Sequence, residues 1–590
     1  MGRTRKVTLI QPESVGGNFE YVAIPRQGML FLSGALRQWR GPFLYEREIW
    51  FEDRSGKIDP DKDLADTDIL MMTALINETP RAYELGRLAK QYHPNLITIG
   101  GGPQMSPLSD AAIREGRFDI IVNREGEDII GQLCDVLLTH KGAELDNALL
   151  KIPGISFMRD GKLVQTPRRG TIAPDFVELP DFHSIRDLTP EKPMAGGVLE
   201  TVRGCTENCS YCQVIQQFLG YRMVARETEF KRLAQLRQLA EEGLIYTNRE
   251  GRFSVFISDD LHPPPLRAVK FRNERLERLR GWKGHTDGMH MICQTRAEIG
   301  QDPELYSAML DAGIQMLYVG VESSSAENLK AVRKRQDPTQ VHQDLVALNR
   351  AGFAVVAMTI IGLPYDTQEA IMQMADWVKQ VSKYQTANWL TPLPATSNWE
   401  TLVPLDENGD VLRPGAIRPY HLYTGKQFVH KDPRWSMQES REIFDRYYAR
   451  LNPVDRLYER VFHVLQRKGF SPLGGRRGLA STLSARVNQM VESLRAMADS
   501  TGNDLSGNLS QRIQQMSDSL RNLADSVGKE LRGNAAAHIQ QMSDSLRSLA
   551  DSAAKEFEEV RRARLRQMSD ALQALAESTR RQLLSPLARR

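Results

Sequence analysis

The residues of this chain best suited to chemistry are three closely spaced cysteines in the segment VRGCTENCSYCQV, namely Cys205, Cys209 and Cys212. Thiolates at the spacing C-x3-C-x2-C can hold three corners of a cubane iron–sulfur cluster and leave its fourth iron without a protein ligand. A structural zinc site would need a fourth ligand, and the next histidine and cysteine along the chain are His262 and Cys293. Five cysteines in 590 residues are too few, and odd in number, for a disulfide framework. We therefore predict a [4Fe-4S] cluster, with three buried loop cysteines as the alternative.

The cysteine loop lies among repeated strand and helix units. It follows the apolar strand GGVLETVRG, and further strands are predicted at 253–258, 289–298, 316–323 and 355–364. Such units form a partial parallel barrel, whose strand carboxyl ends direct polar groups toward a common mouth. Five residues at such ends are candidates for a site, with helix caps or solvated rim groups as the alternative: Asp260, Gln294, Glu322, Ser323 and Gly362. Arg296 and the rest of the turn Gly362-Leu363-Pro364 are predicted at the same ends. The remaining cysteines, Cys134 and Cys293, are predicted to be core residues.

A second set of candidates lies near the N-terminus. Apolar strands at 7–10, 69–73, 96–99 and 119–122 alternate with helices, a pattern that predicts a doubly wound parallel sheet. These sheets bind ligands at the carboxyl ends of their strands. Glycines there let the backbone approach a ligand, and a helix N-terminus can hold an anion; tight turns are the alternative. The candidates are Gly101, Gly102, Pro103, Glu125, Gly126 and Glu127.

The chain changes character along its length, which predicts several parts. They are a sheet domain at 1–150, a connector at 151–190 with a hairpin turn at Asp160-Gly161, the partial barrel at 191–400, a cap at 401–470, a linker at 471–480 and a tail at 481–590. The cap is rich in aromatic residues and would suit a flat or apolar substrate. Its histidines, His421 and His430, are predicted to lie at the surface.

The tail repeats with a period of 26 residues, beginning at QMVESLRAMADS (489) and continuing with related segments at 515, 541 and 567. Within each repeat, apolar residues form one helical stripe, such as Met516, Leu520 and Leu523. The stripe contains too few bulky residues for a core of its own. We therefore expect an all-α tail that self-associates as a coiled coil or pairs with partner helices, with binding to a membrane surface as the alternative.

Composition limits the remaining possibilities. The net charge is +3 and the charged fraction 26%, so no nucleic-acid partner is expected. There is no run of eighteen apolar residues, and the N-terminus is predicted to be a strand where a signal peptide would be apolar. Unpaired thiols and an oxygen-sensitive cluster predict a cytoplasmic protein, membrane-associated only if the tail binds lipid.

The cysteine loop, with a strand before it and Tyr211 before its last cysteine, resembles the cluster loop of the radical S-adenosylmethionine superfamily. The segment GVESSSAENLKAVRKRQ is also similar to a superfamily segment that contacts S-adenosylmethionine. The resemblance implies that S-adenosylmethionine chelates the free iron and is cleaved to a 5'-deoxyadenosyl radical. It also implies contacts with this cofactor from Tyr211 and the five barrel candidates, and an electron donor such as flavodoxin or ferredoxin.

The N-terminal loops resemble the cobalamin-binding domain found upstream of many such enzymes, which implies cobalamin between residues 1 and 150. One departure is that residues 11–27 contain no histidine, where the histidine-ligated cobalamin proteins carry D-x-H-x-x-G. Residues 388–402 resemble the end of the barrel in hopanoid C-2 methylase and the anaerobic magnesium-protoporphyrin cyclase. In all, the resemblance covers about 470 residues.

The resemblance implies a cobalamin-dependent methyltransferase that acts on an unactivated carbon of a small molecule. A radical cyclase or rearrangement enzyme acting on a tetrapyrrole-like or lipid-like substrate is the alternative. An alternative of another class is a scaffold with a structural cluster and an assembly tail.

Overall fold

The computed structural model describes residues 3–14, 24–264, 267, 269–382 and 384–451. The fold is mixed α/β with two large sheets. Residues up to Tyr447 form one compact unit, and a second unit begins at Tyr448. The predicted repeat tail lies outside the described residues. None of the described helices is both long and apolar enough to span a membrane.

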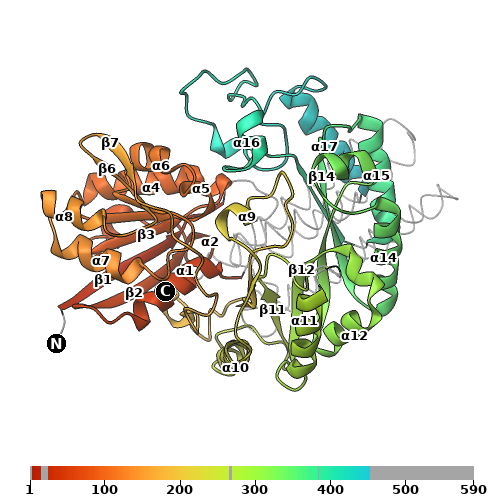
Figure 1. The fold of residues 1–590 in the computed structure, drawn as a ribbon, viewed down its shortest axis with the longest axis horizontal. Helices are drawn as coiled ribbons and strands as arrows, with labels where there is room; N and C mark the ends of the chain where they lie inside the picture. Colours follow the sequence, from red (N-terminus) through yellow and green to blue (C-terminus); the bar gives the residue numbers. More distant parts are fainter. Residues whose placement is uncertain (1–2, 15–23, 265–266, 268, 383, 452–590) are drawn as a thin grey trace, which may run out of the picture. The chain divides into compact units, whose positions relative to one another are not determined.

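The first sheet has seven strands in the order β2-β1-β3-β4-β5-β6-β7 (Figure 1). The first five are parallel and comprise β1 (Arg3–Gln11), β2 (Phe43–Phe51), β3 (Ile69–Thr73), β4 (Ile97–Gly101) and β5 (Ile120–Val122). The four strands predicted near the N-terminus are confirmed. Strand β2 was not predicted, because its sequence FLYEREIWF has charged residues in the middle and only a short apolar end.

A hairpin extends this sheet beyond the part predicted from sequence. Strands β6 (Ile155–Arg159) and β7 (Lys162–Gln165) are antiparallel, and β6 pairs with β5. The predicted turn residues Asp160 and Gly161 both have positive φ, 51° and 73°, as a two-residue type I′ turn requires. The hairpin assigned to the connector is therefore the edge of the first sheet.

Helices cover both faces of the first sheet, so the sheet is doubly wound (Figure 1). One face carries α1 (Gln27–Gln38) and α7 (Ile130–Thr139), with α8 (Gly142–Leu149) after them. The other face carries α4 (Thr79–Tyr92), α5 (Gly102–Met105) and α6 (Ser109–Gly116). Two short helices, α2 (Glu52–Ser55) and α3 (Pro60–Asp63), follow β2.

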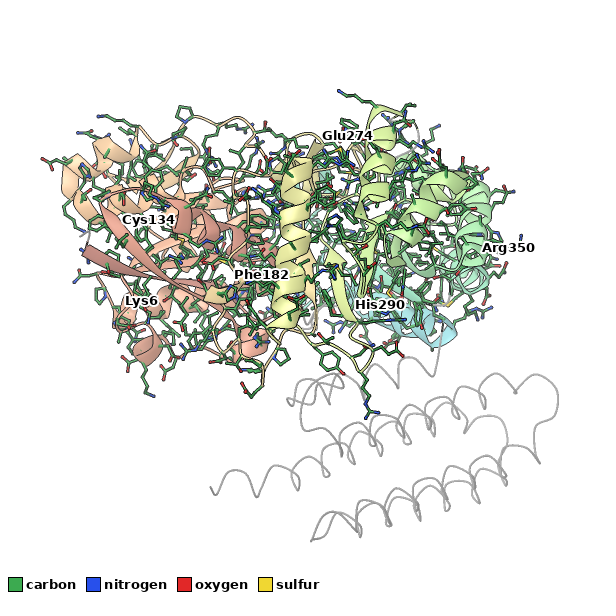
Figure 2. The ribbon with its side chains drawn as sticks, turned by 90° about the horizontal axis from the view of Figure 1, so that it is seen from below. Lys6, Cys134, Phe182, Glu274, His290 and Arg350 are labelled. Atoms are coloured by element: carbon green, nitrogen blue, oxygen red, sulfur yellow. The ribbon has the colours of Figure 1, made fainter. Side chains whose placement is uncertain are left out.

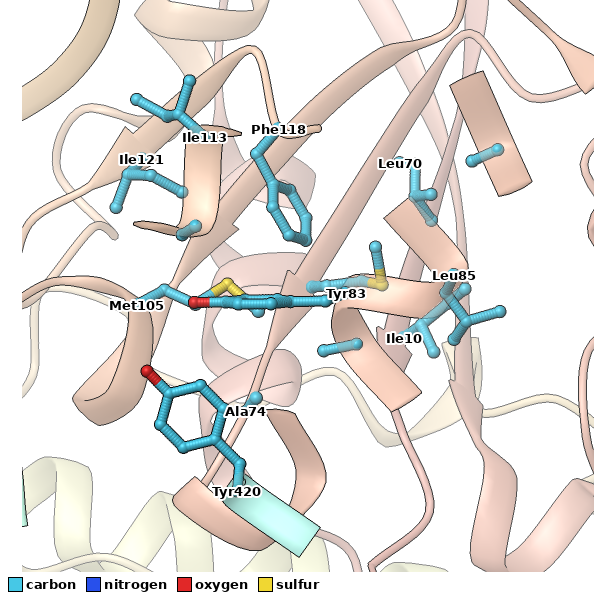
Figure 3. Packing of buried hydrophobic residues seen from close by; sticks show 14 of the residues in the cluster. Ile10, Leu70, Ala74, Tyr83, Leu85, Met105, Ile113, Phe118, Ile121 and Tyr420 are labelled. Carbon is cyan, nitrogen blue, oxygen red and sulfur yellow. The ribbon is translucent and has the colours of Figure 1, made fainter. Parts of the chain in front are cut away.

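A hydrophobic core lies between the first sheet and helices α4 to α6 (Figure 3). It contains Leu70, Tyr83 and Phe118 from this domain. It also contains aromatic residues from far along the chain: Trp399, Tyr420 and Tyr423. The Tyr83 and Tyr420 rings meet edge to face with their centroids 6.3 Å apart, a favoured aromatic geometry. The predicted cap is thus partly built into the first domain.

The second sheet has six parallel strands in the order β15-β14-β13-β12-β11-β8. Its strands are β8 (Gly197–Leu199), β11 (Phe253–Ile257), β12 (Met289–Thr295), β13 (Ile314–Glu322), β14 (Ala354–Ile361) and β15 (Tyr384–Trp389). The four strands predicted after the cysteine loop are confirmed, and β15 is added. A two-stranded sheet pairs β9 (Val202–Arg203) with β10 (Arg222–Met223).

Helices line one face of the second sheet (Figure 1). They are α10 (Arg226–Glu241), α11 (Val269–Trp282), α12 (Pro303–Asp311), α13 (Ala326–Ala331), α14 (Pro338–Ala351) and α15 (Gln368–Val381). Local sequence determines the ends of α14. The Asp337 side chain accepts a hydrogen bond from the Gln340 amide, Pro338 occupies the first turn, and Gly352 ends the helix with a left-handed φ of 108°.

The remaining elements are α9 (Val214–Gln217), α16 (Ser397–Thr401) and α17 (Met437–Leu451). The two cysteines predicted to be core residues are buried, Cys134 in α7 and Cys293 in β12; Figure 2 marks Cys134 in the first domain. Of the two cap histidines, His421 is exposed as predicted. The prediction for His430 was wrong. It is buried against the Phe428 ring, and burial lowers its pKa to about 4.

Candidate functional site

The cysteine loop lies between β9 and β10, and contacts of its first residues fix the backbone there. Gly204 precedes the first cysteine with φ +86°, and a Cβ there would lie 1.9 Å from the carbonyl oxygen of Gly220, so only glycine fits. The Gly204 amide donates to Asp260 Oδ2 over 3.0 Å. The neighbouring Asp259 accepts from the amides of Thr201 and Val202 over 2.6 and 2.8 Å. Two aspartates after β11 therefore fix the approach to the loop.

The three cysteines of the loop face a common region. Cys209 is buried, and Cys205 and Cys212 are partly buried. Burial, with smaller contributions from neighbouring loop thiols, raises the pKa of Cys205 to about 11 and that of Cys212 to about 12. A bound cation would reverse these shifts by stabilising the thiolates. Among the described residues, no three His, Cys, Asp or Glu side chains surround a single-ion position. Three thiols from one loop fit a cubane, which they would hold at separate corners.

Contacts from the second sheet hold the loop in place. Between the first two cysteines, the buried Glu207 pairs with Arg296, which follows β12, over 3.3 Å. The Ser210 amide donates to the Val332 carbonyl over 3.1 Å. These contacts join the loop to segments that follow β12 and β13.

The predicted residues at the end of β13 lie beside the loop. Burial and the Glu322 carboxylate raise the pKa of Tyr211. Lys334 donates to Glu322 Oε1 over 2.8 Å, and both side chains are buried. Glu322 has φ +62°, a conformation that is uncommon for a residue other than glycine and is found at functional sites. Ser323 follows it and is also buried.

A residue of the predicted cap, Arg434, holds the turn that follows β14. The Arg434 guanidinium donates to the carbonyl oxygens of Leu363, Pro364 and Asp366 over 2.6, 3.1 and 2.9 Å, and to that of Gly362 over 3.3 Å. Asp432 fixes the guanidinium from the other side over 2.7 Å. The carbonyls of four of the five residues from 362 to 366 thus share one cation, and no local sequence pattern predicts this contact.

A cavity of about 380 Å³ lies between the first sheet and the cysteine loop. All six candidates of the first domain line it, together with Asp260. The cysteine-loop side contributes Arg203, Gln213 and Phe218. Gly100 and Gly101 also line the cavity and present only backbone atoms to it. The described lining residues include no histidine. The structure therefore brings the two predicted sets of loops together at one cavity.

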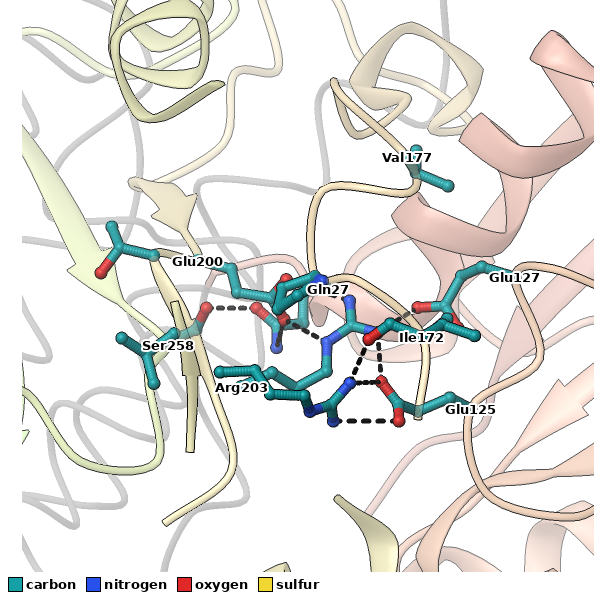
Figure 4. A network of polar contacts seen from close by, with 12 residues as sticks. Gln27, Glu125, Glu127, Ile172, Val177, Glu200, Arg203 and Ser258 are labelled. Carbon is teal, nitrogen blue, oxygen red and sulfur yellow. Dashed lines mark hydrogen bonds and ion pairs between the residues drawn. The ribbon is translucent and has the colours of Figure 1, made fainter. Parts of the chain in front are cut away.

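Arg203, directly before Gly204, is the centre of a buried charge network at this cavity (Figure 4). Its guanidinium donates to Glu125 and Glu127 over 2.8 Å each, and to Glu200 over 3.0 Å. Its side chain is only 4% exposed. Arg222 also pairs with Glu125, over 2.9 Å. The two glutamates predicted as ligand contacts therefore bind the strands that flank the cysteine loop.

The pKa values of the carboxyl groups around this network shift in opposite directions. Desolvation raises the pKa of Glu127, but Arg203 outweighs it, so that the pKa is lowered overall. At Glu200 desolvation prevails and the pKa is raised. Burial raises the pKa of Asp260 to about 7. Gln27 extends the network, because its amide donates to Glu200 over 3.0 Å. Sequence reasoning missed Gln27, Arg203 and Glu200, although Arg203 adjoins the motif.

Of the candidates predicted around the cysteine loop and at the ends of the second sheet's strands, only one is among the described residues that line the cavity. Asp260 lines the cavity, whereas Tyr211, Gln294, Glu322, Ser323 and Gly362 are not among its described lining residues. Gln294 is half-buried on β12, and its carbonyl accepts from the His262 amide over 2.8 Å. Of this second group, Tyr211 belongs to the cysteine loop and Glu322 lies beside it, while Leu363, next to Gly362, packs in one cluster with Tyr211.

Residues 199–378 match the radical SAM superfamily. The chain is 26% identical over 340 residues to an uncharacterized methyltransferase of Pyrococcus horikoshii, an alignment covering 56% of this chain and 68% of the relative. It is 24% identical over 308 residues to the anaerobic magnesium-protoporphyrin IX monomethyl ester cyclase of Synechocystis, covering 51% of this chain and 53% of that protein. The chain thus spans about half of the cyclase.

A solved structure has a similar fold. It is the radical S-adenosylmethionine methyltransferase TsrM from Kitasatospora setae with cobalamin and a [4Fe-4S] cluster bound. The TM-score is 0.60 at 14% sequence identity, and the match covers 84% of this chain and all of that one. At this identity the similarity concerns the fold.

Proposed function

Because residues 199–378 form a radical SAM domain, we propose that this chain is an enzyme that cleaves S-adenosylmethionine and, with a corrinoid, methylates an unactivated carbon. The observation that carries the proposal is the cavity, where the cysteine loop meets both glycine loops of the first sheet. The relatives named as a methyltransferase and a cyclase support the enzyme class. The methyltransferase solved with cobalamin supports the cofactor.

The cysteine loop would hold the cluster, and the residues around it would bind S-adenosylmethionine. When bound, the cluster supplies one electron for cleavage of the sulfonium. Tyr211 lies in the loop, Glu322 and Ser323 lie beside it, and Gly362 heads the turn held by Arg434. Asp260 and Gln294 complete the proposed set. Lys334 holds the Glu322 carboxylate in a fixed position within this set.

The cavity is the proposed corrinoid site. Gly101, Gly102 and Pro103 would allow close approach on one side, and the loop of Glu125, Gly126 and Glu127 on another. A bound corrinoid would supply the methyl group. Since the described lining residues include no histidine, we expect no protein imidazole on cobalt. This agrees with the absence of histidine from residues 11–27.

The inner face of the second sheet suggests an apolar substrate. Residues that face the helices, such as Val255 and Val319, are fully buried. The alternate residues Phe256, Tyr318 and Met358 are only half-buried, and the first two rings pack edge to face. We infer that this sheet is the partial barrel and that these side chains line its interior. A substrate with a flat or aliphatic portion would suit that surface.

The domain boundaries, the role of the tail and the cellular location are further parts of the proposal. We infer the domain boundaries given above, with the hairpin moved to the first sheet. The tail at 481–590 remains a candidate for self-association or for contact with partner helices or a membrane surface, and a cytoplasmic location remains expected.

The test of the proposed function is anaerobic incubation of the reconstituted protein with S-adenosylmethionine, dithionite and hydroxocobalamin, whose cobalt, once reduced, can accept the methyl group of S-adenosylmethionine. Methyl transfer predicts both 5'-deoxyadenosine and S-adenosylhomocysteine. A cyclase or rearrangement enzyme would give 5'-deoxyadenosine without S-adenosylhomocysteine. A scaffold with a structural cluster would give neither product, which would refute the proposal.

Arg434 provides a prediction for S-adenosylmethionine binding. Arg434→Met removes the cation that holds the carbonyls of residues 362–366, so the turn loses its fixed shape. We expect affinity for S-adenosylmethionine to fall about 10-fold, since hydrogen bonds to a charged group contribute about 1.5–3 kcal/mol. Calorimetric titration measures the affinity. Arg434→Lys should restore part of it, and Arg441→Met, on the exposed side of α17, should leave it unchanged. Equal affinity in Arg434→Met and wild type would contradict this role.

A further inference from the structure

The outer edge of the cysteine loop reaches the molecular surface. Between the buried residues of the loop, Thr206 and Asn208 are exposed. Glu207, between them, points inward to Arg296, and the Arg296 guanidinium donates to the Arg335 carbonyl over 2.7 Å. The segment after α13 therefore borders the exposed edge of the loop.

That bordering segment, residues 329–336 with the sequence LKAVRKRQ, contains four bases and no acid. Its side chains fall into a buried group and an exposed group. Val332 and Lys334 are buried, and Lys334 pairs with Glu322. Lys330, Arg333 and Arg335 are exposed. Among the described residues, the ion pairs found include none formed by these three.

Backbone geometry produces this division. Helix α13 ends at Ala331, and Arg333 has a left-handed φ of 57°. The chain then turns back so that the Lys334 amide donates to the Leu329 carbonyl over 2.8 Å. A base at a helix C-terminus is favoured by the helix dipole, which accounts for Lys330. Arg333 and Arg335 lie beyond the last turn, so the dipole does not explain them.

We propose that Lys330, Arg333 and Arg335 form a docking surface for an acidic one-electron carrier protein that reduces the cluster at the exposed edge of the loop. The inference rests on the proposed function, which requires one electron from outside. The carrier loses that electron, the bound cluster gains it, and no bond or proton changes. Unpaired positive charge next to the site of electron entry is complementary to an acidic partner and would steer its approach. A nucleic acid or an anionic membrane would need no contact with the cysteine loop.

The test is the affinity of the full chain for a purified flavodoxin, titrated calorimetrically at low and high salt. Lys330→Glu combined with Arg335→Glu leaves the left-handed Arg333 in place. We expect about 10-fold weaker binding at low salt, and wild-type binding that weakens as salt screens the charges. The matched control is Lys141→Glu with Lys151→Glu, which makes the same charge change at exposed lysines of the first domain, and should bind within about twofold of wild type.

A second measurement separates docking from the proposed chemistry. Lys330 and Arg335 are exposed, at the far end of the segment that begins with Glu322 and Ser323, and neither is among the residues proposed to bind S-adenosylmethionine. Dithionite is a small reductant that needs no docking surface, so it should drive S-adenosylmethionine cleavage equally in wild type and variant. Oxidation of reduced flavodoxin by the variant should be slowed in parallel with the weakened binding. If dithionite gives no cleavage in wild type, the proposed function fails, while flavodoxin affinity still tests the surface.

Several results would overturn the docking surface. They are unchanged flavodoxin affinity in the double variant, an equal loss in the control, or a loss of binding to DNA or anionic vesicles without loss of flavodoxin binding. If the charge-reversed protein does not fold, Lys330→Gln with Arg335→Gln should show an intermediate loss of about threefold. Wild-type affinity in that variant would equally refute the proposal.

Discussion

Cys209→Ala should abolish cleavage of S-adenosylmethionine. Cys209 is the buried central cysteine of the loop, and its removal leaves two thiols where three corners need ligands. We expect loss of the brown cluster absorbance and of all 5'-deoxyadenosine production. Iron analysis after anaerobic reconstitution and product chromatography measure the two effects.

Cys134→Ala is the matched control for this variant. Cys134 is equally buried but lies in α7 of the first domain. This variant should keep its iron and its cleavage activity. A Cys209→Ala protein that retained about four irons per chain with undiminished cleavage would refute the cluster assignment.

Arg203→Met should cause the largest loss of stability of any single substitution at the cavity. The guanidinium is shared by Glu125, Glu127 and Glu200. Its removal takes away the ion-pair partner found for the buried Glu127, whereas Glu125 keeps Arg222 and Glu200 keeps Arg232. Breaking a buried ion pair in this way costs about 3–5 kcal/mol. Because Arg203 immediately precedes the cysteine loop, iron content should fall as well. Urea unfolding and iron analysis measure both effects.

The sign of the pH dependence follows from Glu127. Arg203 lowers the pKa of this carboxyl in the folded protein, so its contribution to stability is present above its unfolded pKa and is lost as pH falls through the folded pKa. Arg203→Met should remove that contribution and flatten this part of the profile. The matched control is Arg114→Met, whose exposed pair with Asp110 should contribute less than about 1 kcal/mol. Equal stability of the Arg203 and Arg114 variants would contradict the role of Arg203.

The sequence predicted elements with strong local patterns. The apolar runs of β3 and β14 and the helix caps of α14 are readable because the deciding residues are neighbours in the chain. Strand β2 was not predicted because charged residues interrupt its apolar pattern. Only its nine-residue parallel pairing with β1 identifies it as a strand.

The motifs of the site were predicted, but the arginines that hold those motifs in place were not. The three cysteines and both glycine loops carry their own signatures. Arg203 and Arg434 do not, because their partners other than Glu200 and Asp432 lie far along the chain. Arg203 meets Glu125 across 78 residues, and Arg434 meets Leu363 across 71. No local pattern of residue types encodes such contacts. His430 was expected at the surface and is buried, with its ring against that of Phe428, two residues earlier in the chain.

The aromatic residues that complete the first core have a consequence for biosynthesis. Trp399, Tyr420 and Tyr423 pack with Tyr83 and its neighbours, yet a ribosome adding 5–20 residues per second needs roughly 10–50 s to pass from residue 150 to residue 399. Throughout that interval the α4 side of the nascent first domain lacks its cover. Chaperones that recognise apolar surface would meet this face in the unfinished chain and lose it once residue 423 has emerged.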